Sequence, residues 1–79
     1  MKSLVLYTTA GCHLCEQAKQ IILPLIEATD FSLQEIDIAE DETLLAAYGL
    51  TIPVVENPVS GRQFNWPFND KQVMELIEE

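Results

Sequence analysis

The sequence has few basic residues. Four lysines and arginines stand against thirteen aspartates and glutamates, which gives a formal net charge of −9. Proteins that bind nucleic acids contact the phosphates with lysine and arginine. The charge balance therefore argues against a nucleic-acid partner, and it disfavours binding to an anionic membrane surface. Two interpretations of the acidic residues stay open: a solvated surface, or steering towards a basic patch on a partner protein.

Long hydrophobic runs are also absent from the sequence. No apolar stretch approaches the roughly 20 residues of a transmembrane helix. The apolar run at residues 4–7 is too short for the hydrophobic region of a signal peptide. We therefore expect a cytoplasmic protein with no membrane partner. Hydrophobic residues still make up 48% of the 79 residues, which is typical of a globular chain, so residues 1–79 are predicted to form a single domain.

Cysteine and histidine are scarce, and this scarcity limits the possible metal sites. The chain has two cysteines, Cys12 and Cys15, and one histidine, His13, which lies between them. A structural zinc ion needs four ligands, so we expect no metal ion in a monomer. A c-type haem site requires a histidine directly after the second cysteine, where this chain has Glu16. A purely structural disulfide over so short a loop would restrain the unfolded chain little, which favours a redox pair.

The two cysteines lie where a predicted strand turns into a predicted helix. A helix N-terminus presents free N–H groups and the positive end of the helix dipole, and both stabilise a reactive thiolate. Cys12, at the start of the helix, is expected to be the exposed nucleophile. Cys15, one turn later, is expected to be the buried resolving thiol. A charged His13 would favour the thiolate further, whereas the carboxylate of Glu16 would oppose it.

The first half of the chain predicts a strand, a helix and a second strand. Residues 2–8 are predicted to form a strand with a continuous apolar run at residues 4–7. Residues 31–38 are predicted to form an edge strand, whose alternation changes phase between Leu33 and Ile36. Residues 14–28 between them predict a helix, which makes the two strands parallel through a right-handed crossover. The apolar positions of this helix have helical spacing: Leu14, Ala18, Ile21, Ile22 and Leu25.

The second half predicts a short helix, a hairpin and a final helix. Asp41 or a neighbour caps a helix that ends at Tyr48 and turns Leu44, Leu45 and Tyr48 inwards. Strands at 54–56 and 62–64 flank five residues rich in turn formers, so they are predicted to be antiparallel. Asn69 begins the last helix, with the Gln72 of a capping box three residues later. Its buried face is predicted to contain Val73, Leu76 and Ile77.

This order of elements, together with two motifs, resembles the glutaredoxins and, through them, the thioredoxin fold. The first motif is Tyr-Thr-Thr-Ala-Gly-Cys-His-Leu-Cys at residues 7–15, and the second is Thr-Ile-Pro-Val-Val at residues 51–55. The chain is most similar to small bacterial glutaredoxin-like proteins with a Cys-His-Leu-Cys site and a Trp-Pro-Phe segment near the end. The resemblance covers nearly the whole chain.

The resemblance implies both an architecture and a set of site residues. The expected α/β fold has the order βαβαββα, with a four-stranded mixed sheet of strand order 2-1-3-4 and helices on both faces. Pro53 would be a cis-proline that faces the thiols, and the backbone of Ile52 would pair with an extended substrate segment. Cys12 would be the nucleophile and Cys15 the resolving thiol.

Two glutathione-binding features of the glutaredoxins are missing. These proteins usually have a lysine shortly before the first cysteine, where this chain has Thr8, Thr9 and Ala10. They also have a Gly-Gly segment that leads to an aspartate at the last helix. Here residues 65–70 read Asn-Trp-Pro-Phe-Asn-Asp, in which Asp70 would keep part of that role. We therefore predict no resident cofactor, with glutathione only as a candidate reductant.

The favoured function is that of a monomeric thiol–disulfide oxidoreductase. Its partners would be a disulfide-bearing protein or a small-molecule thiol, with Cys12, Cys15, His13, Ile52 and Pro53 at the site. Two other functions stay open. In the first, two chains share a metal ion or an iron–sulfur cluster through their Cys12 thiolates. In the second, the domain is a non-catalytic adaptor with a silent pair of cysteines.

Overall fold

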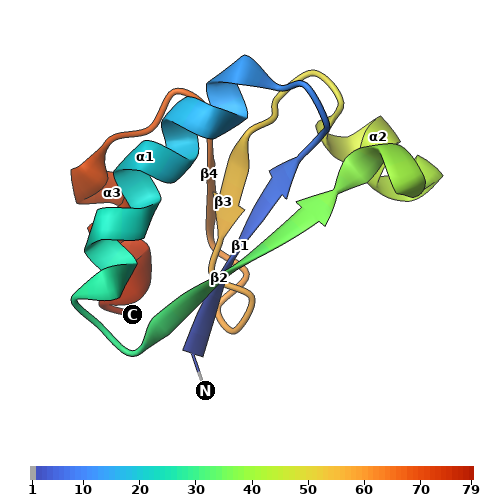
Figure 1. Ribbon diagram of the computed structural model, residues 1–79. Coiled ribbons are helices and arrows are strands. Elements are labelled where there is room, and N and C mark those ends of the chain that lie inside the picture. Colours follow the sequence, from blue (N-terminus) through green and yellow to red (C-terminus); the bar gives the residue numbers. More distant parts are fainter. Residues whose placement is uncertain (1) are drawn as a thin grey trace.

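The fold is a four-stranded sheet with α-helices on both of its faces (Figure 1). It is described by a computed structural model, which covers residues 2–79. The elements follow one another as β1 (Lys2–Thr8), α1 (His13–Glu27), β2 (Phe31–Asp37), a single 3₁₀ turn η1 (Ile38–Glu40), α2 (Glu42–Tyr48), β3 (Val54–Glu56), β4 (Gln63–Asn65) and α3 (Asp70–Ile77).

The strand order is β2-β1-β3-β4, which confirms the prediction. β1 is parallel to β2, because α1 makes the long crossover between them. β3 is antiparallel to both β1 and β4, and β3 and β4 form a hairpin. β4 includes Asn65 and begins one residue later than predicted, because the Arg62 carbonyl still accepts from Asn57 N at 3.0 Å to close the loop.

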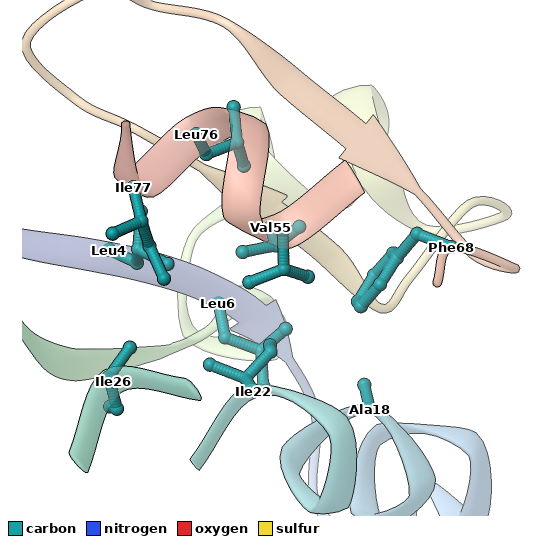
Figure 2. Close-up of a cluster of buried hydrophobic side chains, with 10 residues drawn as sticks. Leu4, Leu6, Ala18, Ile22, Ile26, Val55, Phe68, Leu76 and Ile77 are labelled. Atoms are coloured by element: carbon teal, nitrogen blue, oxygen red, sulfur yellow. The ribbon is translucent and has the colours of Figure 1, made fainter. Parts of the chain in front are cut away.

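The core lies between the sheet and the helices α1 and α3 (Figure 2). Leu4 and Leu6 of β1 and Val55 of β3 point to this face, because alternate residues of a strand face the same side. Two helical stripes cover them: Ala18, Ile22 and Ile26 of α1, and Val73, Leu76 and Ile77 of α3. Fully burying one large aliphatic side chain stabilises a fold by about 1.5–3 kcal/mol, so this layer supplies most of the driving force.

The opposite face of the sheet carries α2. Tyr7 and Val54 are paired in register and point to this side, where the Tyr7 ring stacks on Tyr48 with centroids 4.4 Å apart. None of the residues of α2 is fully buried. The prediction that Leu44, Leu45 and Tyr48 form the inner face of this helix therefore holds in part: Tyr48 packs on the sheet and Leu44 is half-buried, whereas Leu45 is exposed. Leu45 is 49% exposed, since this seven-residue helix lies over the sheet chiefly through the ring of Tyr48.

The buried stripe of α1 also differs from the predicted one. Leu14 is 43% exposed, and Cys15 takes the inward position in the first turn. The helix begins at His13 and ends at Glu27, one residue earlier at each end than predicted. Within residues 2–79, none of the helices is long and apolar enough to cross a membrane.

The change of phase in β2 has a structural cause. Phe31 and Leu33 pack against the core on the side of α1 and α3, whereas Ile36 is paired with Tyr7 and faces the side of α2. The apolar side chains in the first half of β2 therefore pack on the side of α1 and α3, and the apolar side chain near its end packs on the side of α2. Glu35 consequently points to the side of α1, where it forms an ion pair with Lys19 at 3.3 Å.

The predicted helix caps are confirmed. The Asp41 carboxylate accepts from Thr43 N at 2.8 Å and from Leu44 N at 3.3 Å, which holds the first turn of α2. Asn69 and Gln72 form both hydrogen bonds of a capping box at the start of α3. Such caps satisfy N–H groups that have no partner inside the helix.

Candidate redox-active site

One end of the sheet gathers the motifs that the sequence analysis singled out. The register aligns Thr8 of β1 with Asp37 of β2, and Val54 of β3 with both Tyr7 and Asn65. The loop after β1, the segment before β3 and the segment after β4 therefore meet at the same end, at the top of Figure 1. We call residues 8–15, 52–53 and 66–67 the thiol end of the sheet.

The two cysteines are joined as a disulfide at the start of α1. Their Cα atoms are 5.2 Å apart, a separation ordinary for a disulfide. Cys12 is the N-cap residue, with an extended backbone at φ −80° and ψ 107°, and its Sγ accepts from Cys15 N at 3.1 Å. Cys15 is only 2% exposed, whereas Cys12 is half-buried. The expected difference in burial between the two thiols is confirmed.

Gly11 makes the turn that brings Cys12 to the helix start. Its φ is +76°, a left-handed conformation that side chains with a Cβ rarely adopt. A Cβ at this position would meet no atom within 4 Å, so the requirement for glycine comes from the backbone alone. Cys12 N donates to Thr9 O at 3.3 Å across the same turn.

Pro53 and Ile52 lie at the same end, as the resemblance implied. The Ile52–Pro53 peptide bond is cis, and the Pro53 side chain is fully buried while Ile52 is half-buried. Trp66 N donates to Pro53 O at 2.9 Å, which ties this segment to the one after β4. Ile52 N donates to Tyr48 O at 3.1 Å, so this N–H group is already used within the domain.

The Trp-Pro-Phe segment flanks the site with a second cis bond, between Trp66 and Pro67, which the sequence analysis did not predict. The Trp66 ring packs edge-on against Phe68, with centroids 5.2 Å apart and planes at 81°. Phe68 is 5% exposed and belongs to the core, whereas Trp66 is half-buried. These two aromatic residues anchor the segment to the core.

A polar cleft of about 410 Å³ lies along the turn that leads from β1 to Cys12. Its walls are the backbone turn at residues 8–11 and the side chains of Glu16, Lys19, Glu35 and Asp37. The predicted pair of Lys19 and Glu16 is present at 3.2 Å, and Glu35 binds the same ammonium group. The hydrogen bond with Glu16 is the main cause of a raised pKa of Lys19. The sequence analysis did not place Glu35 or Asp37 near the thiols, because only the parallel pairing of β1 and β2 brings them there.

Tyr7 lies just before this site, on the α2 side of the sheet. Its O–H donates to Glu56 Oε1 at 2.8 Å. Burial, together with this hydrogen bond to a carboxylate, raises the pKa of Tyr7 to about 12. The neutral phenol therefore keeps its proton in the folded protein well above the usual titration range of tyrosine.

His13 is the first residue of α1, and its side chain is exposed. It lies between the cysteines in the chain, but it does not turn inwards with Cys15. In the part of the chain that the structure describes, no group of three or more histidine, cysteine, aspartate or glutamate side chains is arranged to hold a metal ion.

Comparisons with known proteins agree with this geometry. Residues 3–78 match the model of the glutaredoxin-like domain family (DUF836). The target protein XcR50 from X. campestris has 35% sequence identity and a TM-score of 0.78, and the alignment covers 95% of each chain. Protein Ne2328 from Nitrosomonas europaea has 29% identity and a TM-score of 0.79, covering 96% of this chain and 89% of that one.

A more distant similarity concerns the fold alone. A mutant thioredoxin from Halobacterium salinarum has 23% identity and a TM-score of 0.71, over 96% of this chain and 71% of that one. The fold is therefore thioredoxin-like, and the site is a pair of cysteines within disulfide distance. The chain belongs to the glutaredoxin-like domain family, and its architecture and cysteine pair support a redox function.

Proposed function

We propose that the protein is a thiol–disulfide oxidoreductase in which Cys12 attacks and Cys15 resolves. The observation that carries this proposal is the disulfide at the N-terminus of α1, in which Cys12 is half-buried and Cys15 is almost fully buried. A bond that joins these two sulfurs in the oxidised form leaves two thiols in the reduced form. The pair is thereby able to pass two electrons to another disulfide.

The reaction consists of two exchange steps. In the reduced protein, the Cys12 thiolate attacks one sulfur of a partner disulfide, the partner's S–S bond breaks, and its other sulfur leaves as a thiolate. Cys15 then loses its proton to solvent or to the departing thiolate and attacks the Cys12 sulfur. The mixed disulfide breaks and the Cys12–Cys15 bond forms. The partner gains two electrons and, after protonation, two thiols.

The local geometry supports Cys12 as the nucleophile. Cys15 N points at Cys12 Sγ at 3.1 Å, and the first turn of a helix carries a partial positive charge. The same N–H group would stabilise a thiolate on Cys12 and so lower its pKa. Cys15 is 2% exposed, so an external disulfide reaches Cys12 first. A charged His13 at the first position of α1 would act in the same direction as the helix.

Ile52 and Pro53 are proposed to line the path of the substrate. Because Ile52 N is bonded to Tyr48 O at 3.1 Å, an extended partner segment would pair with the Ile52 carbonyl rather than with its N–H group. Pro53, which is buried before β3, would face the thiols from the same end of the sheet. We further propose that the protein works as a monomer in the cytoplasm, without a resident cofactor.

Single-cysteine variants test the assignment of the two thiols. The reduced Cys15→Ser variant, mixed with excess bis(2-hydroxyethyl) disulfide, is expected to stop as a mixed disulfide on Cys12. Mass spectrometry of the intact protein detects this adduct. Cys12→Ser is the matched control, because it keeps one thiol but leaves it at the buried position. It is expected to react at least about tenfold more slowly, since access limits thiol exchange.

Equal rates for the two variants, or a faster reaction at Cys15, would contradict the assignment of the nucleophile. No reaction of the wild-type dithiol with any disulfide would overturn the oxidoreductase proposal as a whole. The adaptor and the cluster-binding dimer would then be the functions to test, the second by visible absorbance of the purified protein.

A further inference from the structure

The aromatic ring of Tyr48 is held by two strands of the sheet. It stacks on the ring of Tyr7 in β1, with centroids 4.4 Å apart and planes at 21°. Its hydroxyl oxygen accepts from Gln63 Nε2 of β4 at 3.5 Å. Tyr48 is the last residue of α2, a helix in which no residue is fully buried. The ring is therefore the main contact that fixes the C-terminal end of α2 on the sheet.

The backbone carbonyl of Tyr48 holds the segment that leads into β3. Three hydrogen bonds reach this oxygen, from Thr51 N at 2.9 Å, from Ile52 N at 3.1 Å and from Thr51 Oγ1 at 3.3 Å. We call residues 51–53 the pre-β3 segment. Because this segment is bonded to the end of α2, its position depends on the Tyr48 ring, and loss of the ring contact would release both.

Most backbone groups of Ile52 and Pro53 are already used within the domain. Ile52 N is bonded to Tyr48 O, and Pro53 has no N–H group. Pro53 O accepts from Trp66 N at 2.9 Å. Residues 2–79 donate no hydrogen bond to Ile52 O, and Ile52 is only half-buried. The group that these two residues offer to a partner is therefore an acceptor, which needs an N–H donor on the partner.

The pre-β3 segment lies at the end of the sheet that carries the cysteines. Tyr7 and Val54 are paired in antiparallel register, so the turn after β1 and the segment before β3 meet at this end (Figure 1). β1 leads through that turn to Cys12 at the start of α1. The stack of Tyr7 on Tyr48 thus joins the strand that leads to Cys12 to the helix that holds Ile52.

We propose that Tyr48 is a positioning residue for disulfides in extended polypeptide segments. Its ring, stacked on Tyr7, sets the Ile52 carbonyl so that this oxygen accepts an N–H group of the substrate backbone. The hydrogen bond places the substrate disulfide for attack by Cys12, while Tyr48 itself contacts neither the substrate nor the reacting sulfurs. This proposal rests on the proposed oxidoreductase function and names its substrate class. Disulfides that have no N–H group lack this contact, so Tyr48 has no effect on their reaction.

Matched substrates test the proposal. The first is a peptide whose single cysteine carries a 2-pyridyl disulfide, and the second is the same peptide with N-methyl groups on the cysteine and on the residue at either side of it. The third, methyl 2-pyridyl disulfide, has the same leaving group and no hydrogen-bond donor. Absorbance of the released 2-thiopyridone gives the second-order rate constant with reduced protein. With the wild type, N-methylation of the peptide is expected to slow the reaction about fivefold, which corresponds to the loss of one hydrogen bond.

Variants of α2 assign the effect to the Tyr48 ring. Tyr48→Leu removes the stack on Tyr7 and is expected to slow the reaction with the unmethylated peptide about fivefold. The rate constants with the N-methylated peptide and with methyl 2-pyridyl disulfide are expected to stay unchanged. Tyr48→Phe keeps the stacked ring and is expected to restore the wild-type rate. Leu45→Ala is the matched control, because it truncates a side chain of the same helix that is 49% exposed.

Two outcomes overturn the proposal. In the first, Tyr48→Leu slows the reaction with all three substrates by the same factor, which would show a general loss of structure around the thiols, or leaves all three unchanged. In the second, the wild-type protein reacts equally fast with both peptides, a result that requires no variant to fold. A failure of the proposed function is distinct from both. In that case the reduced wild-type protein would stop as a mixed disulfide, and intact-mass measurement would find no Cys12–Cys15 disulfide.

Discussion

The two faces of the sheet are built very differently. On one face, α1 and α3 each contribute a stripe of fully buried side chains to a continuous core (Figure 2). On the other face, α2 has no fully buried residue and lies over the sheet chiefly through the ring of Tyr48 on Tyr7. The first face therefore supplies most of the stability. The second face keeps its polar groups in contact with one another, as in the hydrogen bond from Tyr7 to Glu56.

This contrast separates stability from the site. The residues of the candidate site come from both layers: Cys15 is buried at the start of α1, and Ile52 follows α2 with its N–H bonded to Tyr48 O. The well-packed helix α1 holds the buried Cys15, and the lightly packed helix α2 leads into residues 52–53, which are proposed to contact the substrate. Changes in the two layers should therefore have different consequences for unfolding.

The largest effect is expected from the core layer. Ile22→Ala removes a fully buried side chain from the centre of α1. The expected loss is about 2–5 kcal/mol in the free energy of unfolding, because the cavity collapses only partly. Urea denaturation followed by circular dichroism measures this value. A loss below about 1 kcal/mol would contradict the claim that the α1 and α3 face supplies most of the stability, because a loss of that size is typical of an average substitution and not of a large truncation in a core.

A smaller effect is expected at the polar contact on the other face. Tyr7→Phe keeps the ring that stacks on Tyr48 but removes the donor to Glu56 Oε1. The expected destabilisation is about 1 kcal/mol, near the net contribution of one hydrogen bond. The same denaturation experiment measures it. An unchanged free energy of unfolding would show that water replaces the phenol at Glu56 without cost.

The hydrogen bond between Tyr7 and Glu56 also predicts that the free energy of unfolding depends on pH. The pKa of Tyr7 is raised to about 12 in the folded protein, whereas an unfolded tyrosine titrates near 10. The unfolded chain therefore loses this proton first, and the stabilisation that is complete below pH ~10 disappears as the pH rises towards 12. The difference in unfolding free energy between the wild type and Tyr7→Phe is expected to narrow over this window. A difference that stays constant from pH 9 to 12 would contradict the raised pKa.

The smallest effect is expected at the exposed side of α2. Leu45 is 49% exposed, so Leu45→Ala removes apolar surface that already contacts water. The free energy of unfolding is expected to change by less than about 0.5 kcal/mol, as for most surface substitutions. Thermal melts of the Leu45→Ala and Ile22→Ala variants, measured side by side, make the comparison directly. A large loss would mean that Leu45 is covered by a partner or by the sheet.

The part of the fold that follows from local pattern was predictable. Periodicity placed α1 and α3, the caps at Asp41 and Asn69 mark helix starts, and the hairpin follows from turn residues at 57–61. The side of α2 that would be buried was not predictable, because helical spacing shows which residues share a face but not how far the sheet extends beneath it. Leu45 was placed wrongly for this reason.

The site was predictable in part. The spacing of Cys12 and Cys15 before a helix indicated a redox pair and the relative burial of its two thiols. Glu35 and Asp37 lie about twenty residues or more after the cysteines in the chain, and they line the cleft only through the parallel register of β1 and β2. No local pattern reports such a register.

The most direct test of the central claim is a redox titration of the wild-type protein. The protein is equilibrated in glutathione buffers of graded potential, free thiols are trapped by alkylation, and the mass of the intact chain is read. We expect a reversible, two-electron transition between the dithiol and the Cys12–Cys15 disulfide, at about −200 to −270 mV as for glutaredoxins and thioredoxin. Thiols that stay free across the whole range, or a reaction that stops at a glutathione adduct on Cys12, would contradict the dithiol mechanism.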